Sequence, residues 1–146
     1  MFKSILIVCV GNICRSPTAE ALLKHKLEGR DIQISSAGLG ALVGKGVDPT
    51  AAAVMAESGI TLHDHYARQL TRQMVHDADL ILTMENRHIK AICELTPEAR
   101  GKTFLFGRWL NGCETPDPYR QQRPAFVHVY QILDKAADAW LPYLTR

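Results

Sequence analysis

A cysteine and an arginine near the start of the chain form a pattern that suits phosphoryl-transfer chemistry. The segment CVGNICRS contains Cys9, Arg15 and Ser16. An apolar run precedes it and a serine–proline pair ends it, which indicates a strand, a loop and the start of a helix. Backbone N–H groups that converge in such a loop can hold an anion at the helix N-terminus. The same field stabilises a thiolate, so Cys9 is a candidate nucleophile.

The neighbours of Cys9 would complete an anion site. Arg15 can bind two phosphoryl oxygens in a bidentate fork, and the Ser16 hydroxyl can donate a hydrogen bond to the thiolate. The rest of the loop would line the anion with its backbone: Val10, Gly11, Asn12, Ile13 and Cys14. The alternative is a structural cysteine, because a buried thiol at a strand end behaves as a small apolar side chain. Cysteine and arginine at this spacing are weak evidence alone, so the strand and helix around them carry the prediction.

The apolar pattern predicts the elements that position this loop. Apolar runs predict buried strands at 4–10 and 78–84, and further strands are expected at 32–36, a short one, and at 103–106. Helical spacing and capping residues predict four helices: from Ser16 as N-cap to Gly29, from Asp48 to Gly59, after residue 84, and along 126–141. Strands that alternate with helices predict a parallel sheet with helices on both faces. The glycine-rich stretch 39–46 is expected to be a mobile loop.

Length and composition exclude several classes of protein. The chain has 146 residues, of which 47% are hydrophobic and 22% charged, and this indicates one globular domain over 1–146. A net charge of +2 gives no reason to expect a nucleic-acid partner. The run 5–10 is too short for a membrane span or a signal peptide, so we expect a cytoplasmic protein. The four cysteines include no C-x-x-C pair, so no metal site is expected.

Two separated motifs resemble those of the low-molecular-weight protein tyrosine phosphatases. CVGNICRS is similar to the C-x5-R-S signature loop of that family, and Asp117-Pro118-Tyr119 is similar to its second signature. The segments SAGLGALVGKG, ARQL, LILTME and GKTFLFGRW resemble the bacterial subgroup that acts with capsule and exopolysaccharide tyrosine kinases. The resemblance covers essentially the whole chain. It implies a flavodoxin-like α/β fold of the phosphatase I type, no cofactor, and a phosphotyrosine protein substrate, here a bacterial tyrosine autokinase.

The resemblance also implies the roles of the reacting groups. Cys9 would attack phosphorus in line and form a cysteinyl-phosphate, while Arg15 clamps the phosphate. Asp117 would protonate the leaving phenolate and then activate the water that hydrolyses the intermediate. Prolines 116 and 118 fix φ on both sides of Asp117. The alternative for Asp117 is an Asx-turn residue in a proline-rich loop.

Further residues match positions that support the phosphate loop in the family. Asn12 is expected in a left-handed conformation held by Ser36 and His65. The alternatives are a strand-end hydroxyl for Ser36 and an exposed loop histidine for His65. Cys14 could trap an oxidised Cys9 as a reversible disulfide, or it could simply pack in the interior.

An apolar slot for a phenyl ring is expected beside the loop. Its walls would come from Ile13, Leu39, Leu42 and Tyr119. Arg120 follows Tyr119 where eukaryotic members carry a second tyrosine, and the wall region is rich in leucine and glycine. These departures concern substrate preference rather than the reaction.

Two other functions were weighed. An arsenate reductase of this fold needs two further cysteines close together, whereas Cys93 and Cys113 lie far apart in the sequence and Cys93 falls on an apolar helix face. A phosphotyrosine-binding module without turnover would be expected to lack Cys9, Arg15 or Asp117. All three are present, so hydrolysis is the favoured prediction.

Overall fold

The centre of the protein is a four-stranded parallel sheet. The computed structural model describes residues 2–146. The strands are β1 (Ser4–Cys9), β2 (Gln33–Gly38), β3 (Leu80–Thr83) and β4 (Thr103–Leu105), in the order β2-β1-β3-β4. The register pairs Cys9 with Gly38, and Val8 with both Ala37 and Thr83. The predicted α/β class, with four parallel strands, is therefore confirmed.

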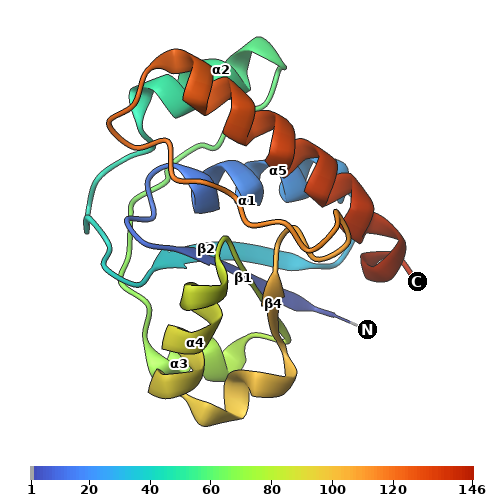
Figure 1. Cartoon of the computed structure of the whole chain (residues 1–146). Helices are drawn as coiled ribbons and strands as arrows, with labels where there is room; N and C mark the ends of the chain where they lie inside the picture. Colours follow the sequence, from blue (N-terminus) through green and yellow to red (C-terminus); the bar gives the residue numbers. More distant parts are fainter. Residues whose placement is uncertain (1) are drawn as a thin grey trace.

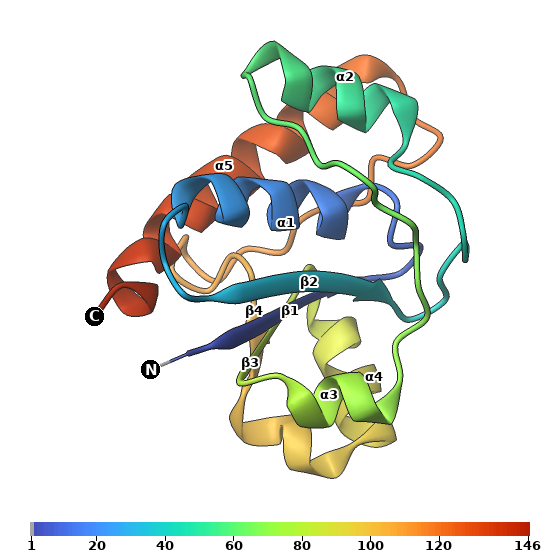
Figure 2. The same ribbon diagram turned by 180° about the vertical axis from the view of Figure 1, so that it is seen from behind.

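Helices cover both faces of the sheet. One face carries α1 (Arg15–Lys26), α2 (Pro49–Glu57) and the long α5 (Arg123–Leu144), and the other carries α3 (Arg72–Asp77) and α4 (Asn86–Leu95), as Figures 1 and 2 show from opposite sides. A short 3₁₀ helix, η1 (Pro97–Gly101), follows α4. No helix within residues 2–146 combines the length and the apolar character needed to cross a membrane.

The two faces of β1 belong to different parts of the core. Ile5, Ile7 and Cys9 lie in the cluster that includes α1 and α5 residues, whereas Leu6 and Val8 lie in the cluster that includes Ile92 of α4. Side chains alternate between the faces of a strand. Because both faces are covered, the strand is apolar throughout, as the sequence predicted.

Several element boundaries differ from the prediction. Helix α1 begins at Arg15, so Ser16 is not its N-cap, and the residue at that position, Cys14, makes no side-chain capping bond. The Ser16 hydroxyl is instead used by the site described below. The last helix of the chain and α2 were placed correctly, and Asp48 caps α2 by accepting hydrogen bonds from the N–H groups of Thr50 and Ala51. The short helices α3 and η1 were not predicted, because six and five residues are too few for a clear periodicity.

The segment between β2 and α2 is attached to the loop after β1. The N–H groups of Leu39, Gly40 and Leu42 donate to the carbonyls of Cys9, Val10 and Gly11. A Cβ atom at Gly38 would lie 2.3 Å from the carbonyl oxygen of Val10, so only glycine allows this close approach. These contacts fix the segment beside the loop; its expected mobility stays a prediction.

Candidate active site

Cys9 lies at the carboxyl end of β1, a central strand, where open parallel sheets bind their ligands. Its side chain is 2% exposed. The Sγ atom lies 2.9 Å from Oγ of Ser16, which in turn accepts a hydrogen bond from Nδ2 of Asn12 at 2.8 Å. The expected contact between the thiol and the Ser16 hydroxyl is thus present.

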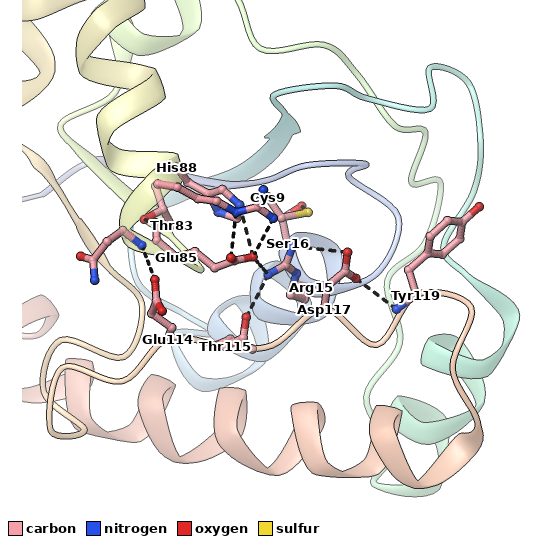
Figure 3. Close-up of polar contacts among 12 residues, drawn as sticks. Cys9, Arg15, Ser16, Thr83, Glu85, His88, Glu114, Thr115, Asp117 and Tyr119 are labelled. Carbon is pink, nitrogen blue, oxygen red and sulfur yellow. Dashed lines mark hydrogen bonds and ion pairs between the residues drawn. The ribbon is translucent and has the colours of Figure 1, made fainter.

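Arg15 is held in the interior by groups from two other segments. Its side chain is 2% exposed, and Nη1 donates to Oε2 of Glu85 at 2.6 Å and to the carbonyl oxygen of Thr115 at 2.9 Å. Nη2 lies 3.7 Å from Oδ2 of Asp117 (Figure 3). The guanidinium therefore has a fixed orientation, as a bidentate phosphate ligand requires.

Glu85 was missed as a site residue, although it closes the segment LILTME. It follows β3, the strand beside β1, so the sheet order brings it to Arg15. Burial opposes its ionisation, but hydrogen bonds from Arg87 and Arg15 outweigh burial and lower the pKa of Glu85 to about 2. Glu85 is accordingly a carboxylate at neutral pH and balances the charge of Arg15.

His88 is a second missed neighbour, on the first turns of α4. It is 1% exposed, and neither ring nitrogen has a hydrogen-bond partner within residues 2–146. Its Nε2 lies 3.5 Å from Oε2 of Glu85. Burial, with the nearby charge of Arg15, lowers the pKa of His88 to about 4, so the imidazole is neutral at neutral pH.

Asp117 combines the two interpretations that the sequence left open. Its Oδ1 accepts a hydrogen bond from the N–H of Tyr119 at 3.0 Å, which is an Asx turn. Its Oδ2 faces Arg15, and the residue lines the same pocket as Cys9 (Figure 3). The Asx turn therefore holds one carboxylate oxygen of Asp117, while the other oxygen faces the pocket.

The pocket beside Cys9 has a volume of about 150 Å³. Leu42 and Tyr119 stand at its rim, each more than one third exposed. The lining residues are Cys9, Val10, Gly11, Asn12, Ile13, Cys14, Arg15, Gly40, Leu42, Asp117 and Tyr119. Leu39, expected in the wall, is not among them. It packs instead with the Leu6 and Val8 cluster on the α3 and α4 side of the sheet.

Asn12 has the expected left-handed conformation, with φ of 60°. Its Nδ2 donates to Oγ of Ser36 at 3.0 Å, and Nε2 of His65 donates to its carbonyl oxygen at 2.7 Å. Sequence reasoning missed a third contact, in which the N–H of Arg68 donates to Oδ1 of Asn12 at 3.0 Å. A non-glycine residue with positive φ is strained, and these contacts hold it in place.

Cys14 is buried beside the pocket, between α2 and the start of α5. It belongs to a cluster with Val54 and Phe126, and all four cysteines of the chain are free thiols. Burial, followed by the charge of Asp48, raises the pKa of the Cys14 thiol well above its ordinary value. Cys14 is therefore a thiol at neutral pH. No cluster of three metal-ligating side chains is found in the described residues 2–146.

Comparison with known proteins agrees with this site. The family model described as "Low molecular weight phosphotyrosine protein phosphatase" matches residues 4–146. The tyrosine phosphatase Wzb of Escherichia coli strain K12 is 56% identical over 140 residues, which are 96% of this chain and 94% of Wzb. The crystal structure of AmsI from Erwinia amylovora is 53% identical, covers 100% of this chain and 95% of its own, and has a TM-score of 0.95. Wzb from Vibrio vulnificus in complex with benzylphosphonate is 46% identical, with 98% and 99% coverage and a TM-score of 0.94.

The chain belongs to the low-molecular-weight phosphotyrosine protein phosphatase family. It is a protein-tyrosine-phosphatase, a hydrolase similar to Wzb and AmsI. Both the family and the bacterial subgroup that the sequence resembles are confirmed.

Proposed function

We propose that the chain hydrolyses phosphotyrosine through a cysteinyl-phosphate on Cys9. The observation that carries this proposal is that Cys9, Arg15 and Asp117 line one pocket, although the last of these comes from the opposite end of the chain. A thiolate at Cys9 would receive a hydrogen bond from Ser16, while Arg15 and the loop N–H groups hold the phosphoryl oxygens.

The first step exchanges one bond to phosphorus for another. The Cys9 sulfur forms the S–P bond with its electron pair as the P–O bond to the tyrosine breaks, and Asp117 gives its proton to the departing phenolate. In the second step Asp117 takes a proton from water, the water oxygen attacks phosphorus, and the S–P bond breaks. Inorganic phosphate leaves, and Cys9 and Asp117 return to their starting states.

The shape of the pocket favours an aryl phosphate. Ile13, Leu42 and Tyr119 give it apolar sides above the loop, and these suit a phenyl ring that carries its phosphate to the base. Benzylphosphonate in the Vibrio vulnificus relative pairs an aromatic ring with a phosphonate. This supports a phosphotyrosine protein as the substrate here.

We further propose a bacterial tyrosine autokinase that controls capsule or exopolysaccharide production as the protein substrate, in the cytoplasm. The support is the similarity to the bacterial subgroup and the agreement of the reduced cysteines with that compartment. A tyrosine-phosphorylated autokinase fragment should lose phosphate to this enzyme faster than an unrelated phosphotyrosine protein. Equal rates for both proteins would contradict the autokinase assignment and leave the phosphatase assignment standing.

Substitution of Cys9 tests the reaction directly. Cys9→Ser should lose turnover of phosphotyrosine and p-nitrophenyl phosphate by at least about 10³-fold, but should still bind vanadate or phosphate, because the loop and Arg15 remain. Cys93→Ser on α4 is the matched control and should keep wild-type rates with and without a chelator. Serine-variant turnover within tenfold of wild type would overturn the mechanism. Phosphoserine should be a poor substrate for both active proteins.

A further inference from the structure

A continuous set of hydrogen bonds runs from Cys9 away from the pocket and ends on a carboxylate. Ser16 contacts the thiol, and Asn12 Nδ2 contacts both Ser16 and Ser36. Oγ of Ser36 then donates to Oε1 of Glu20 at 2.5 Å. Glu20 lies on α1 and is 7% exposed. It does not line the pocket that contains Cys9, so it does not touch the reacting atoms.

The direction of these hydrogen bonds follows from what each group can donate. The Asn12 amide has two N–H bonds, and both are used, one toward each serine oxygen. Each serine has a single proton left. Ser36 gives its proton to the Glu20 carboxylate, which accepts only. The proton of Ser16 is then free to point at Cys9 Sγ, its remaining neighbour.

Two further contacts involve this set, one at Asn12 in its middle and one at Glu20 at its end. The N–H of Arg68 donates to Oδ1 of Asn12 at 3.0 Å, so the Asn12 amide turns its Nδ2 toward the serines. Lys24 donates to Oε2 of Glu20 at 2.7 Å, whereas Oε1 accepts from Ser36. Glu20 and Lys24 border a second surface hollow of about 250 Å³.

Loss of the Glu20 acceptor would set Ser36 and Asn12 in conflict. The Ser36 proton would then seek the Asn12 side chain. An Asn12 amide turned to accept it would give up the hydrogen bond from the N–H of Arg68 and would present Oδ1 to Ser16 as well. Ser16 would donate to Asn12 and have no proton for the thiolate. Buried polar groups change partners in this way because an unpaired one is costly.

We propose that Glu20 is a positioning residue, which fixes the proton of Ser36 and thereby keeps the Ser16 hydroxyl a donor to the Cys9 thiolate. The proposal rests on the proposed role of Cys9 as nucleophile. It predicts that loss of Glu20 disfavours the Cys9 thiolate, which is the opposite of what a simple charge effect predicts. Removal of a nearby negative charge would by itself favour the thiolate, whereas loss of the Ser16 donor disfavours it.

Alkylation of Cys9 by iodoacetate as a function of pH gives the test, because it reports thiolate formation without turnover. Glu20→Gln keeps the shape of the side chain. Lys24 would bind the new amide oxygen, so the NH₂ group would face Ser36 in place of the acceptor. We expect the pH midpoint of alkylation to rise by roughly 0.5–1 unit, the size of one lost hydrogen bond to the thiolate. The value of kcat/KM at pH 6 should fall roughly 3- to 10-fold with KM little changed.

A second substitution separates an effect of the hydrogen bonds between Cys9 and Glu20 from a general structural effect. In Glu20→Gln with Ser36→Ala the competing hydroxyl is gone, so the midpoint should return to within about 0.2 unit of wild type. Lys24→Met removes a charge beside Glu20 but leaves the acceptor, and its midpoint should stay within the same limit. Glu20→Met, which has no polar group, should behave as Glu20→Gln does.

Three results would overturn the proposal: a midpoint that falls in Glu20→Gln, one that does not move, or a rise that Ser36→Ala leaves unchanged. The first would indicate a charge effect and the last a structural one. Failure of the proposed function would look different. The wild-type chain would then show no turnover that depends on Cys9, and Cys9 would not be the nucleophile.

Discussion

Oε2 of Glu85 lies 2.6 Å from Nη1 of Arg15, and the two residues stand 70 positions apart in the chain. The carboxylate reaches the arginine because it follows β3, the strand beside β1. In the proposed mechanism Arg15 holds the phosphate, so the residue that orients the phosphate is itself oriented by a neighbouring strand.

Glu85→Gln should therefore damage both catalysis and stability. We expect kcat/KM for p-nitrophenyl phosphate to fall roughly 10- to 100-fold, because the guanidinium loses its fixed orientation. The free energy of unfolding should fall by about 1–3 kcal/mol, as measured in urea, since a buried charge loses its partner. Glu94→Gln, on α4 and without a contact to Arg15, should match wild type in both measurements. Wild-type kinetics in Glu85→Gln would remove the orienting role.

Asp117→Asn should slow hydrolysis according to the leaving group. The asparagine can still accept the Tyr119 N–H and keep the turn, but it cannot give a proton to the phenolate. Tyrosine phosphate, whose phenol has a pKa near 10, should be hydrolysed roughly 10²–10⁴-fold more slowly. Nitrophenolate leaves with less help, so its ester should lose less.

Equal losses for the two esters would assign Asp117 to the turn alone. A loss that followed the unfolding temperature would have the same meaning.

Mild peroxide should inactivate the enzyme reversibly. An oxidised Cys9 would be attacked by Cys14 to give a disulfide, which a thiol reductant opens. Because the pKa of Cys14 is raised, this step should accelerate as the pH rises. In Cys14→Ser, activity after peroxide should recover less completely, and peptide mapping of the wild type should find the Cys9–Cys14 linkage. Equal recovery in both proteins without a linkage would leave Cys14 a packing residue.

His88 should make the fold sensitive to acid. Its pKa is about 4 in the folded protein against an ordinary 6.5, so the unfolded chain binds the proton more tightly. Its contribution to stability is present above pH 6.5 and is lost as the pH falls from 6.5 toward 4, on the order of 1–2 kcal/mol between pH 7 and pH 5. The Glu85 contribution is lost only below its ordinary pKa of 4.5. Urea unfolding of His88→Asn at pH 7 and pH 5 should show a smaller difference than wild type. An equal difference in both proteins would contradict the assignment.

The sequence predicted those parts of the site that depend on local pattern. The continuous apolar run of β1 and the capping pair Asp48-Pro49 are local signals, and both elements formed as expected. The position of Glu85 could not be predicted with the same ease. It depends on the order of the strands, and this order is set by packing of the whole sheet. Glu20 was not predicted as a residue of the site for a similar reason, because its partner Ser36 comes from a strand rather than from its own helix.

Errors at residues 16 and 39 have a common origin. Ser16 followed by proline is a good local capping signal, but the hydroxyl is used by Cys9 and Asn12 and the helix begins two residues earlier than expected. Leu39 was expected in the wall of the pocket, whereas it packs with Leu6 and Val8 on the α3 and α4 side of the sheet. In both cases a tertiary contact overrode the local preference.

The hydrogen bond from Arg15 to the carbonyl of Thr115 spans 100 positions of the chain, and Asp117 lies just beyond it. During synthesis on a ribosome the loop of Cys9 emerges early, but Arg15 and Asp117 meet only after most of the chain has been made. Activity is thus a property of the finished chain, and phosphatase assays on nascent or truncated chains would report when its last segment has folded into place.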